Sequence, residues 1–256
     1  MGRPCWICGS AKSTREHVWP KWLRKIATSE VGSYRIGVTN DPSGWQVRTG
    51  AAFTHTSRVL CGDCNGRLSD LEGRVAQVLP RLVGGATTRL TAFEQEILAQ
   101  WFYKTGLMVS TTMDHDAAAL PKSHYRDLGQ SFDLPPASAA WIGHLEERTH
   151  EAALWVQRFQ WQDRWLDNAP MGDGYMFAIS IADVSAVVAV LDVRQSPDST
   201  EMKPFVQGGA AAGRLSRIWP VSEHYSVSWP PPLKLTAVQF QDVADSLQRL
   251  GTAVAG

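Results

Sequence analysis

The sequence predicts an α+β fold in which a small cysteine-stapled unit precedes a larger α+β region. Three observations support this prediction. All four cysteines fall within the first 64 residues, in two Cys-x-x-Cys pairs. Apolar residues then recur with helical spacing after Asn65 and again after Thr91. From Trp141 onward the apolar runs are short and separated by turn residues, which is typical of strands.

The composition is that of a globular protein long enough to bury a core. Of the 256 residues, 44% are hydrophobic and 20% are charged, which excludes a disordered, collagen-like or disulfide-scaffold chain. The longest apolar stretch, from Val184 to Val193, is too short to cross a bilayer. The N-terminus lacks the apolar segment of a secretory signal, so we expect a cytoplasmic protein.

The net charge of zero conceals two oppositely charged segments. Residues 1–90 contain 13 Lys and Arg against 6 Asp and Glu, whereas residues 91–256 contain 12 against 19. The basic segment is where a polyanion such as nucleic acid would bind. The acidic segment would repel DNA, so it is better suited to regulation, oligomerisation or specificity.

Cys5, Cys8, Cys61 and Cys64 predict a structural zinc site. The two thiolates of a Cys-x-x-Cys turn point towards one centre, and two such pairs complete a tetrahedral site. Disulfides are rare in the reducing compartment expected here. A redox pair of the thioredoxin type is the alternative, but it would leave the second cysteine pair unexplained.

The first predicted helix begins at Asn65, directly after the second cysteine pair. Its apolar residues form one stripe, which comprises Leu68, Leu71, Val75, Val78 and Leu79. Pro80 is expected to end or bend this helix. Gly84-Gly85 indicates a loop, and we therefore predict a boundary between a unit of residues 1–85 and a unit of residues 86–256.

The second unit is expected to combine helices and strands. Thr91 and Glu94 form a capping-box pattern at the start of a helix that should run to about Val109. We expect its tryptophans to lie mainly in the core. The elements expected after this helix are a strand at Ala153–Gln157, a turn at Gly172–Gly174, a hairpin of Tyr175–Ile181 and Val187–Val193 that turns at Asp183–Ser185, and a closing helix at Thr236–Leu250 with Val238 and Val243 on its apolar side.

A motif around residue 17 gives the first indication of chemistry. Thr14-Arg-Glu-His-Val-Trp-Pro-Lys-Trp-Leu23 lies between the cysteine pairs, and Asn65 follows the second pair. Glu-His with Val and Pro following, and then Cys-x-x-Cys-Asn opening a helix, resembles the zinc-anchored HNH endonucleases of the His-Me finger (ββα-metal) superfamily. The resemblance covers about residues 1–80, and it implies a small ββα-metal fold stapled by zinc.

The resemblance also implies the roles of three residues. His17 would be the base that takes a proton from water, and Glu16 and Asn65 would bind a divalent ion that holds the scissile phosphate. Such an oxygen-rich site suits Mg²⁺ or Mn²⁺ better than zinc. Duplex DNA is the substrate that the resemblance implies, and nucleases of this kind often serve in bacterial restriction or phage defence.

Several residues near the motif are candidates for supporting roles. Glu72 lies on the same helix face as Asn65, and it would either orient a metal-bound water or be a solvated helix charge. His55 is expected to be an ordinary strand or surface residue. Basic side chains around the motif would be able to contact phosphates; they are Arg15, Lys21, Arg24, Lys25, Arg58 and Arg67.

Two differences from the family pattern keep other functions open. There is no further His on or near the helix, and Thr56 stands where the family often has an Asn. These differences favour, as an alternative, a zinc-stapled nucleic-acid-binding module without catalytic activity. A third hypothesis is a sensor or scaffold in which the tryptophan-rich residues 86–256 bind a partner or a regulatory ligand, or form a homo-oligomer.

Overall fold

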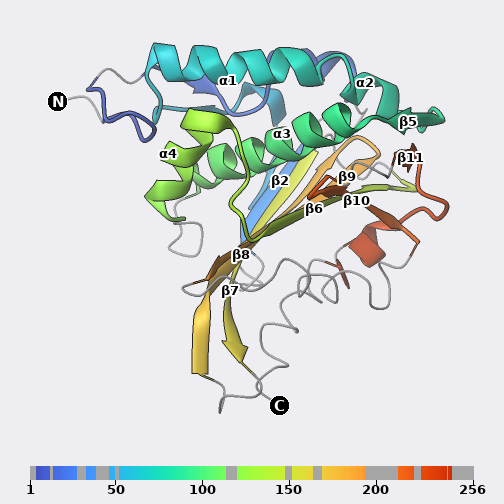
Figure 1. Ribbon diagram of the computed structural model, residues 1–256. Coiled ribbons are helices and arrows are strands. Elements are labelled where there is room, and N and C mark those ends of the chain that lie inside the picture. The colour runs from blue at the N-terminus through green and yellow to red at the C-terminus, as the bar shows by residue number, and fades with distance from the viewer. Residues whose placement is uncertain are drawn as a thin grey trace.

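The structure, a computed structural model, consists of helices stacked over one face of a large sheet. The residues described are 4–11, 14–27, 33–38, 46–49, 52–113, 120–147, 152–163, 169–193, 213–221, 226–240 and 242–243. Helix α1 (Gly62–Val75) is outermost, and α3 (Ala92–Ser110) lies between α1 and the sheet (Figure 1). The prediction of a mixed α+β fold is confirmed.

The large sheet contains seven strands within the described residues. Their order is β10-β6-β9-β8-β7-β2-β3, and neighbours are antiparallel except for β2 and β7, which are parallel. The bounds are β2 Ser33–Val38, β3 Gln46–Thr49, β6 Ser138–His144, β7 Ala152–Asp163, β8 Ala169–Ile181, β9 Val184–Val193 and β10 Leu215–Trp219.

Both faces of this sheet are apolar. On the face towards α3, Leu154 and Phe177 belong to the main core. On the opposite face, Trp155 and Ala178 form a second cluster with Phe240. Successive residues of a strand point to opposite sides, so a sheet covered on both faces requires nearly continuous apolar strands. Burial of the sheet on both faces therefore explains the apolar runs in the sequence after Trp141.

The first helix follows its predicted stripe and ends earlier than expected. Leu68, Leu71 and Val75 are buried, and α1 ends at Val75. Pro80 lies in the first turn of the short helix α2 (Leu79–Leu82), where its missing N–H needs no partner. The other helical elements are α4 (Lys122–Ser131) and the 3-10 helices η1 (Lys21–Lys25) and η2 (Ala52–Thr54).

Helix α3 begins where the sequence predicts. The Thr91 hydroxyl accepts a hydrogen bond from the Glu94 N–H at 3.2 Å, and the Glu94 carboxylate accepts one from the Thr91 N–H at 2.8 Å. This capping box is the predicted one, and it satisfies two N–H groups that the helix itself leaves free. The helix continues to Ser110 and is buried along almost its whole length.

The predicted strands are present, and one predicted turn is wrong. Strand β8 runs through Gly172–Gly174, because Gly172 pairs with Trp161 of β7 and with Val193 of β9. Glycine weakens a strand without ending it, and pairing on both edges holds this one. The β8–β9 hairpin turns at Ala182 and Asp183, one residue before the predicted start of the turn.

The closing helix is only partly as predicted. Helical structure is described at residues 237–240 and 242–243. Val243 is buried as expected, but Val238 is 70% exposed. Phe240 takes the inward position, where its ring stands edge-on to Trp155 with 5.6 Å between the centroids. The rest of the predicted helix, to Leu250, lies outside the described residues.

Most of the tryptophans after residue 90 whose side chains are described lie in the core, as predicted, and Trp219 is half-buried against it. Trp101, Trp141, Trp155 and Trp229 are all buried. Trp229 ends strand β11 (Val227–Trp229), which pairs with β5 (Thr88–Leu90), and its indole N–H donates to a carbonyl oxygen of α2. Within the described part of the chain, no helix is both long and apolar enough to span a bilayer.

Elements from both sides of the predicted boundary at residue 85 share one sheet and one core. Strand β2 precedes the boundary but pairs with β7, which follows it. Leu71 of α1 and Phe177 of β8 belong to the same core cluster. The Gly84 N–H donates to both carboxylate oxygens of Asp183, at 3.1 and 2.9 Å. These contacts join the two sides of residue 85, and the division into units of residues 1–85 and 86–256 stays a prediction.

The close approach of α3 to the sheet makes Gly106 a sensitive position. A Cβ on Gly106 would lie 2.3 Å from the Phe177 ring, whereas a Cβ on Gly73 of α1 would meet nothing within 4 Å. We expect Gly106→Ala to destabilise the protein by about 1–3 kcal/mol through overpacking. Gly73→Ala should instead stabilise it by about 0.5–1 kcal/mol through helix propensity. Urea unfolding midpoints of the two variants test this, and equal midpoints would contradict it.

Candidate functional site

The four cysteines form one cluster at the start of α1. Their sulfurs all lie within 4.8 Å of one another, and all four cysteines are free of disulfides. A tetrahedral zinc site with Zn–S bonds of about 2.3 Å separates its sulfurs by about 3.8 Å, and Cys8 Sγ and Cys61 Sγ are 3.6 Å apart. The cluster is compatible with the predicted structural zinc site.

Local backbone structure brings the two cysteine pairs together. The first pair lies in a turn in which the Cys5 N–H donates to Ser10 and the Gly9 N–H to Cys5. Gly9 has a φ of +78°, a conformation that glycine adopts at little cost. The Trp6 N–H donates to Val59 O at 2.8 Å, which ties this turn to the segment before Cys61. Cys61 itself is the N-cap of α1.

The surroundings of the sulfurs shift the pKa values of Cys5 and Cys64 in opposite directions. Burial opposes ionisation of Cys5, but N–H groups of Cys8, Cys61 and Ile7 that donate to its sulfur lower its pKa to about 7. Burial raises the pKa of Cys64 to about 12, and a metal ion would have to displace that proton. The Arg67 guanidinium lies 3.4 Å from Cys64 Sγ. Arg67, which is exposed and is predicted to contact phosphate, therefore lies beside the cysteine cluster.

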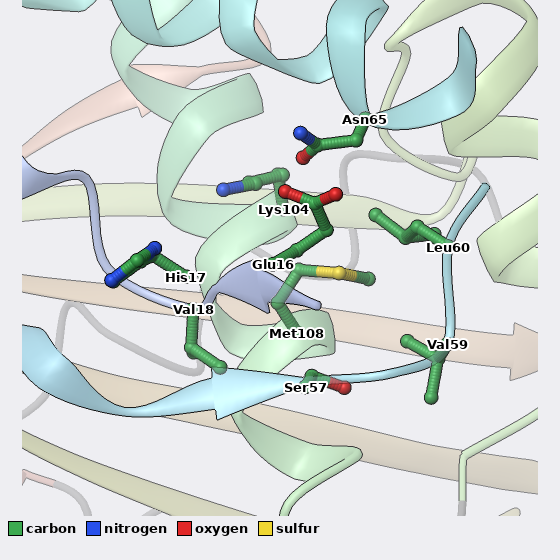
Figure 2. Close-up of a pocket in the computed structure, with 9 residues that line it drawn as sticks. All are labelled: Glu16, His17, Val18, Ser57, Val59, Leu60, Asn65, Lys104 and Met108. Carbon is green, nitrogen blue, oxygen red and sulfur yellow. The ribbon is translucent and has the colours of Figure 1, made fainter. Parts of the chain in front are cut away.

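The Glu-His pair is held by a short two-stranded sheet. Strand β1 (Glu16–His17) pairs with β4 (Thr56–Ser57), with His17 opposite Thr56. The Val18 N–H donates to His55 O at 2.9 Å and extends this pairing. Adjacent residues of a strand point to opposite sides, and the Glu16 carboxylate and the His17 ring accordingly diverge (Figure 2).

Glu16, His17 and Asn65 line one pocket. Asn65 lies in the first turn of α1, and its N–H donates to Cys61 O at 2.9 Å. Its side-chain amide and the Glu16 carboxylate are directed towards each other across the pocket (Figure 2). The space amounts to about 260 Å³, including its open mouth. Its lining residues are Glu16, His17, Val18, Ser57, Val59, Leu60, Asn65, Lys104 and Met108.

The donor atoms in this pocket suit a hard divalent cation. Glu16 offers carboxylate oxygens and Asn65 an amide oxygen, the ligand types that Mg²⁺ and Mn²⁺ prefer. The Thr14 hydroxyl donates to Glu16 Oε1 and orients the carboxylate. Both Glu16 and His17 are half-buried, so the pocket is open to an incoming ligand.

The other predicted site residues lie outside the pocket. Lys21 is exposed on η1. Arg15 is also exposed, and its Nε donates to the Thr56 hydroxyl at 3.0 Å. Thr56 thus binds Arg15, and its neighbour Ser57 faces the pocket. His55 does not line the pocket, which agrees with its predicted ordinary role.

Glu72 has a partner that the sequence analysis did not anticipate. Its carboxylate, which is 18% exposed, forms an ion pair with Lys104 of α3, and Glu72 does not itself line the pocket. Lys104 itself lines the pocket. The only signal in the sequence was that Lys104 is the single cation of residues 91–109 and stands in the mainly apolar stretch from Ile97 to Val109. Nothing in the local pattern indicates that this helix packs beside Asn65.

Comparison with known proteins adds no relatives. A scan against protein-family models, a search of curated proteins and a search of solved structures each found no match to this chain.

Proposed function

We propose that this protein is a metal-dependent HNH-type endonuclease that hydrolyses DNA phosphodiester bonds. The observation that carries the proposal is that Glu16, His17 and Asn65 all line one pocket, close in sequence to the four clustered cysteines. Strand β1 pairs with β4, and helix α1 comes next after β4 along the chain, an arrangement compatible with a ββα-metal fold. Zinc bound by the four cysteines would be structural, since it leaves no coordination position for substrate.

His17 would act as the general base. His17 lines the pocket and is half-buried, and its imidazole would take a proton from an attacking water. The water oxygen forms a bond to phosphorus, the bond from phosphorus to the leaving oxygen breaks, and that oxygen takes a proton from solvent. Glu16 and Asn65 would hold Mg²⁺ or Mn²⁺, which supplies positive charge to the phosphate and the leaving oxygen.

The metal requirement provides the direct test of this proposal. Purified protein should nick or linearise plasmid DNA when Mg²⁺ or Mn²⁺ is added to zinc-loaded protein. Asn65→Ala removes one proposed ligand, and we expect the Mg²⁺ concentration for half-maximal cleavage to rise by roughly 10–100-fold. Ser69→Ala, an exposed residue one turn further along α1, is the matched control.

A specific result would reject the nuclease. If the wild-type protein binds DNA but does not cleave it with either ion, the zinc-stapled binding module becomes the better hypothesis. Thr56 occupies the position where the family often has an Asn, and its hydroxyl accepts a hydrogen bond from Arg15. This contact favours the binding module without catalytic activity. The metal separates the two, since a binder requires zinc alone.

A further inference from the structure

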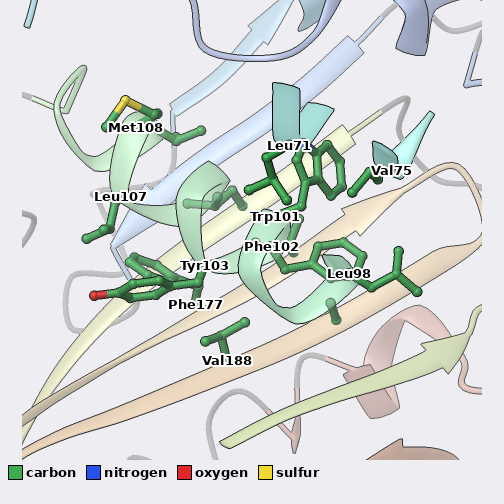
Figure 3. Packing of buried hydrophobic residues seen from close by; sticks show 14 of the residues in the cluster. Leu71, Val75, Leu98, Trp101, Phe102, Tyr103, Leu107, Met108, Phe177 and Val188 are labelled. Carbon is green, nitrogen blue, oxygen red and sulfur yellow. The ribbon is translucent and has the colours of Figure 1, made fainter. Parts of the chain in front are cut away.

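Lys104 is the one residue of α3 that is both charged and buried. Its side chain is 3% exposed. Figure 3 shows that α3 passes between Leu71 and Val75 of α1 on one side and Phe177 and Val188 of the sheet on the other. Removing an ammonium group from water is costly, whereas Met or Leu would fill a similar volume without that cost. Core packing therefore does not explain this lysine.

The Lys104 ammonium has hydrogen-bonding capacity left for a ligand. It donates to one oxygen of Glu72, whose side chain is 18% exposed. An ammonium has three N–H donors, and Glu72 is its only hydrogen-bond or ion-pair partner that the described residues supply. The Lys104 side chain lines the same pocket as Glu16 and Asn65 (Figure 2).

We infer that Lys104 binds a non-bridging oxygen of the scissile phosphodiester and that Glu72 is the residue that positions it. This inference rests on the proposed nuclease function. Attack by water adds negative charge to the non-bridging oxygens, and a fixed ammonium in a partly dry pocket stabilises that charge. The site would thus extend beyond residues 1–85, because α3 supplies one of its contacts.

The first experiment compares plasmid cleavage by Lys104→Met with that by Lys234→Met. Lys234 is exposed and does not line the pocket, so both variants lose one charge but only one loses the contact. We expect Lys104→Met to lower kcat by at least 100-fold, to change KM by less than threefold and to melt no lower than wild type. Cleavage by Lys104→Met within threefold of Lys234→Met would overturn the inference. If Lys104→Met does not fold, Lys104→Gln, of similar length and uncharged, replaces it with the same expectation.

The second experiment tests the positioning role of Glu72. Glu72→Gln should lower kcat by about tenfold, because Lys104 keeps its charge but loses its orientation. In the Lys104→Met background the same change should have no further effect on kcat, since Glu72 acts through Lys104. If the ion pair is purely structural, the loss of activity in each variant should instead parallel the decrease in its melting temperature. Additive losses in the double variant would overturn the role of Glu72.

A binding measurement distinguishes failure of this inference from failure of the nuclease proposal. In the His17→Ala background, the affinity for a fluorescent 20-base-pair DNA duplex is measured by anisotropy over a range of salt concentrations. Lys104→Met should lower the slope of log affinity against log salt by about 0.9, the value for one lost phosphate contact. Lys234→Met should leave the slope unchanged. If wild type does not cleave but this difference is found, the lysine contact stands without the nuclease, whereas equal slopes overturn the contact.

Discussion

His17→Ala should abolish cleavage of plasmid DNA while leaving the protein folded. A positioned general base contributes about 10²–10⁴-fold to rate, and we expect a loss within this range at saturating Mg²⁺. His17 is half-buried and belongs to a two-residue strand whose pairing is made by the backbone. Removing its ring therefore costs little packing. The measurement is the initial rate of supercoil loss, with the zinc content of both proteins confirmed to be equal.

The matched control for this variant is His55→Ala. His55 lies next to strand β4 and does not line the pocket, and its contact with Val18 is made by its carbonyl oxygen. The His55→Ala variant should cleave DNA at a rate within a few-fold of that of the wild type. Equal losses in the two variants would contradict the assignment of His17 as the base, as would a His17→Ala variant with full activity.

The other large effect is expected from loss of the cysteine cluster. Cys61→Ser, or prolonged treatment with a strong zinc chelator, should remove one zinc per chain and lower the melting temperature sharply. Structural zinc contributes about 10–16 kcal/mol in small zinc domains, and whole domains are stable by only about 5–15 kcal/mol. Cys61 is the N-cap of the helix that carries Asn65, so cleavage should be lost with the metal.

Gly62→Ser provides the control for this second prediction. Residue 62 is exposed, and a Cβ there would approach the Thr14 methyl group no closer than 3.9 Å. This variant should keep its zinc, its melting temperature and its activity. Elemental analysis and thermal unfolding followed by circular dichroism give the result. If the Cys61→Ser protein contains no zinc but has the same melting temperature as the wild type, the cluster does not support the fold.

Local features of the fold followed from the sequence because they depend on residues close together in the chain. The capping box of Thr91 and Glu94 and the apolar stripe of α1 are confirmed. The expected turn at Gly172–Gly174 is wrong, since pairing with two neighbouring strands outweighs the preference of glycine for turns. Strand β2 was not predicted, because its partner β7 lies more than a hundred residues further along the chain.

The candidate site also combines features that the sequence predicted with features that depend on tertiary packing. The spacing of the cysteines predicted that they form one metal-binding cluster, and the resemblance of the Glu-His and Cys-x-x-Cys-Asn motifs to a nuclease family pointed to Glu16, His17 and Asn65. Helical spacing places Arg67 beside Cys64, three residues away in α1, whereas tertiary packing alone decided that Lys104 lines the pocket. Lys104 and Glu72 are 32 residues apart, and their meeting depends on how α3 packs between α1 and the sheet. Local periodicity shows that a helix forms and which residues share a face, but it does not show what lies across that face.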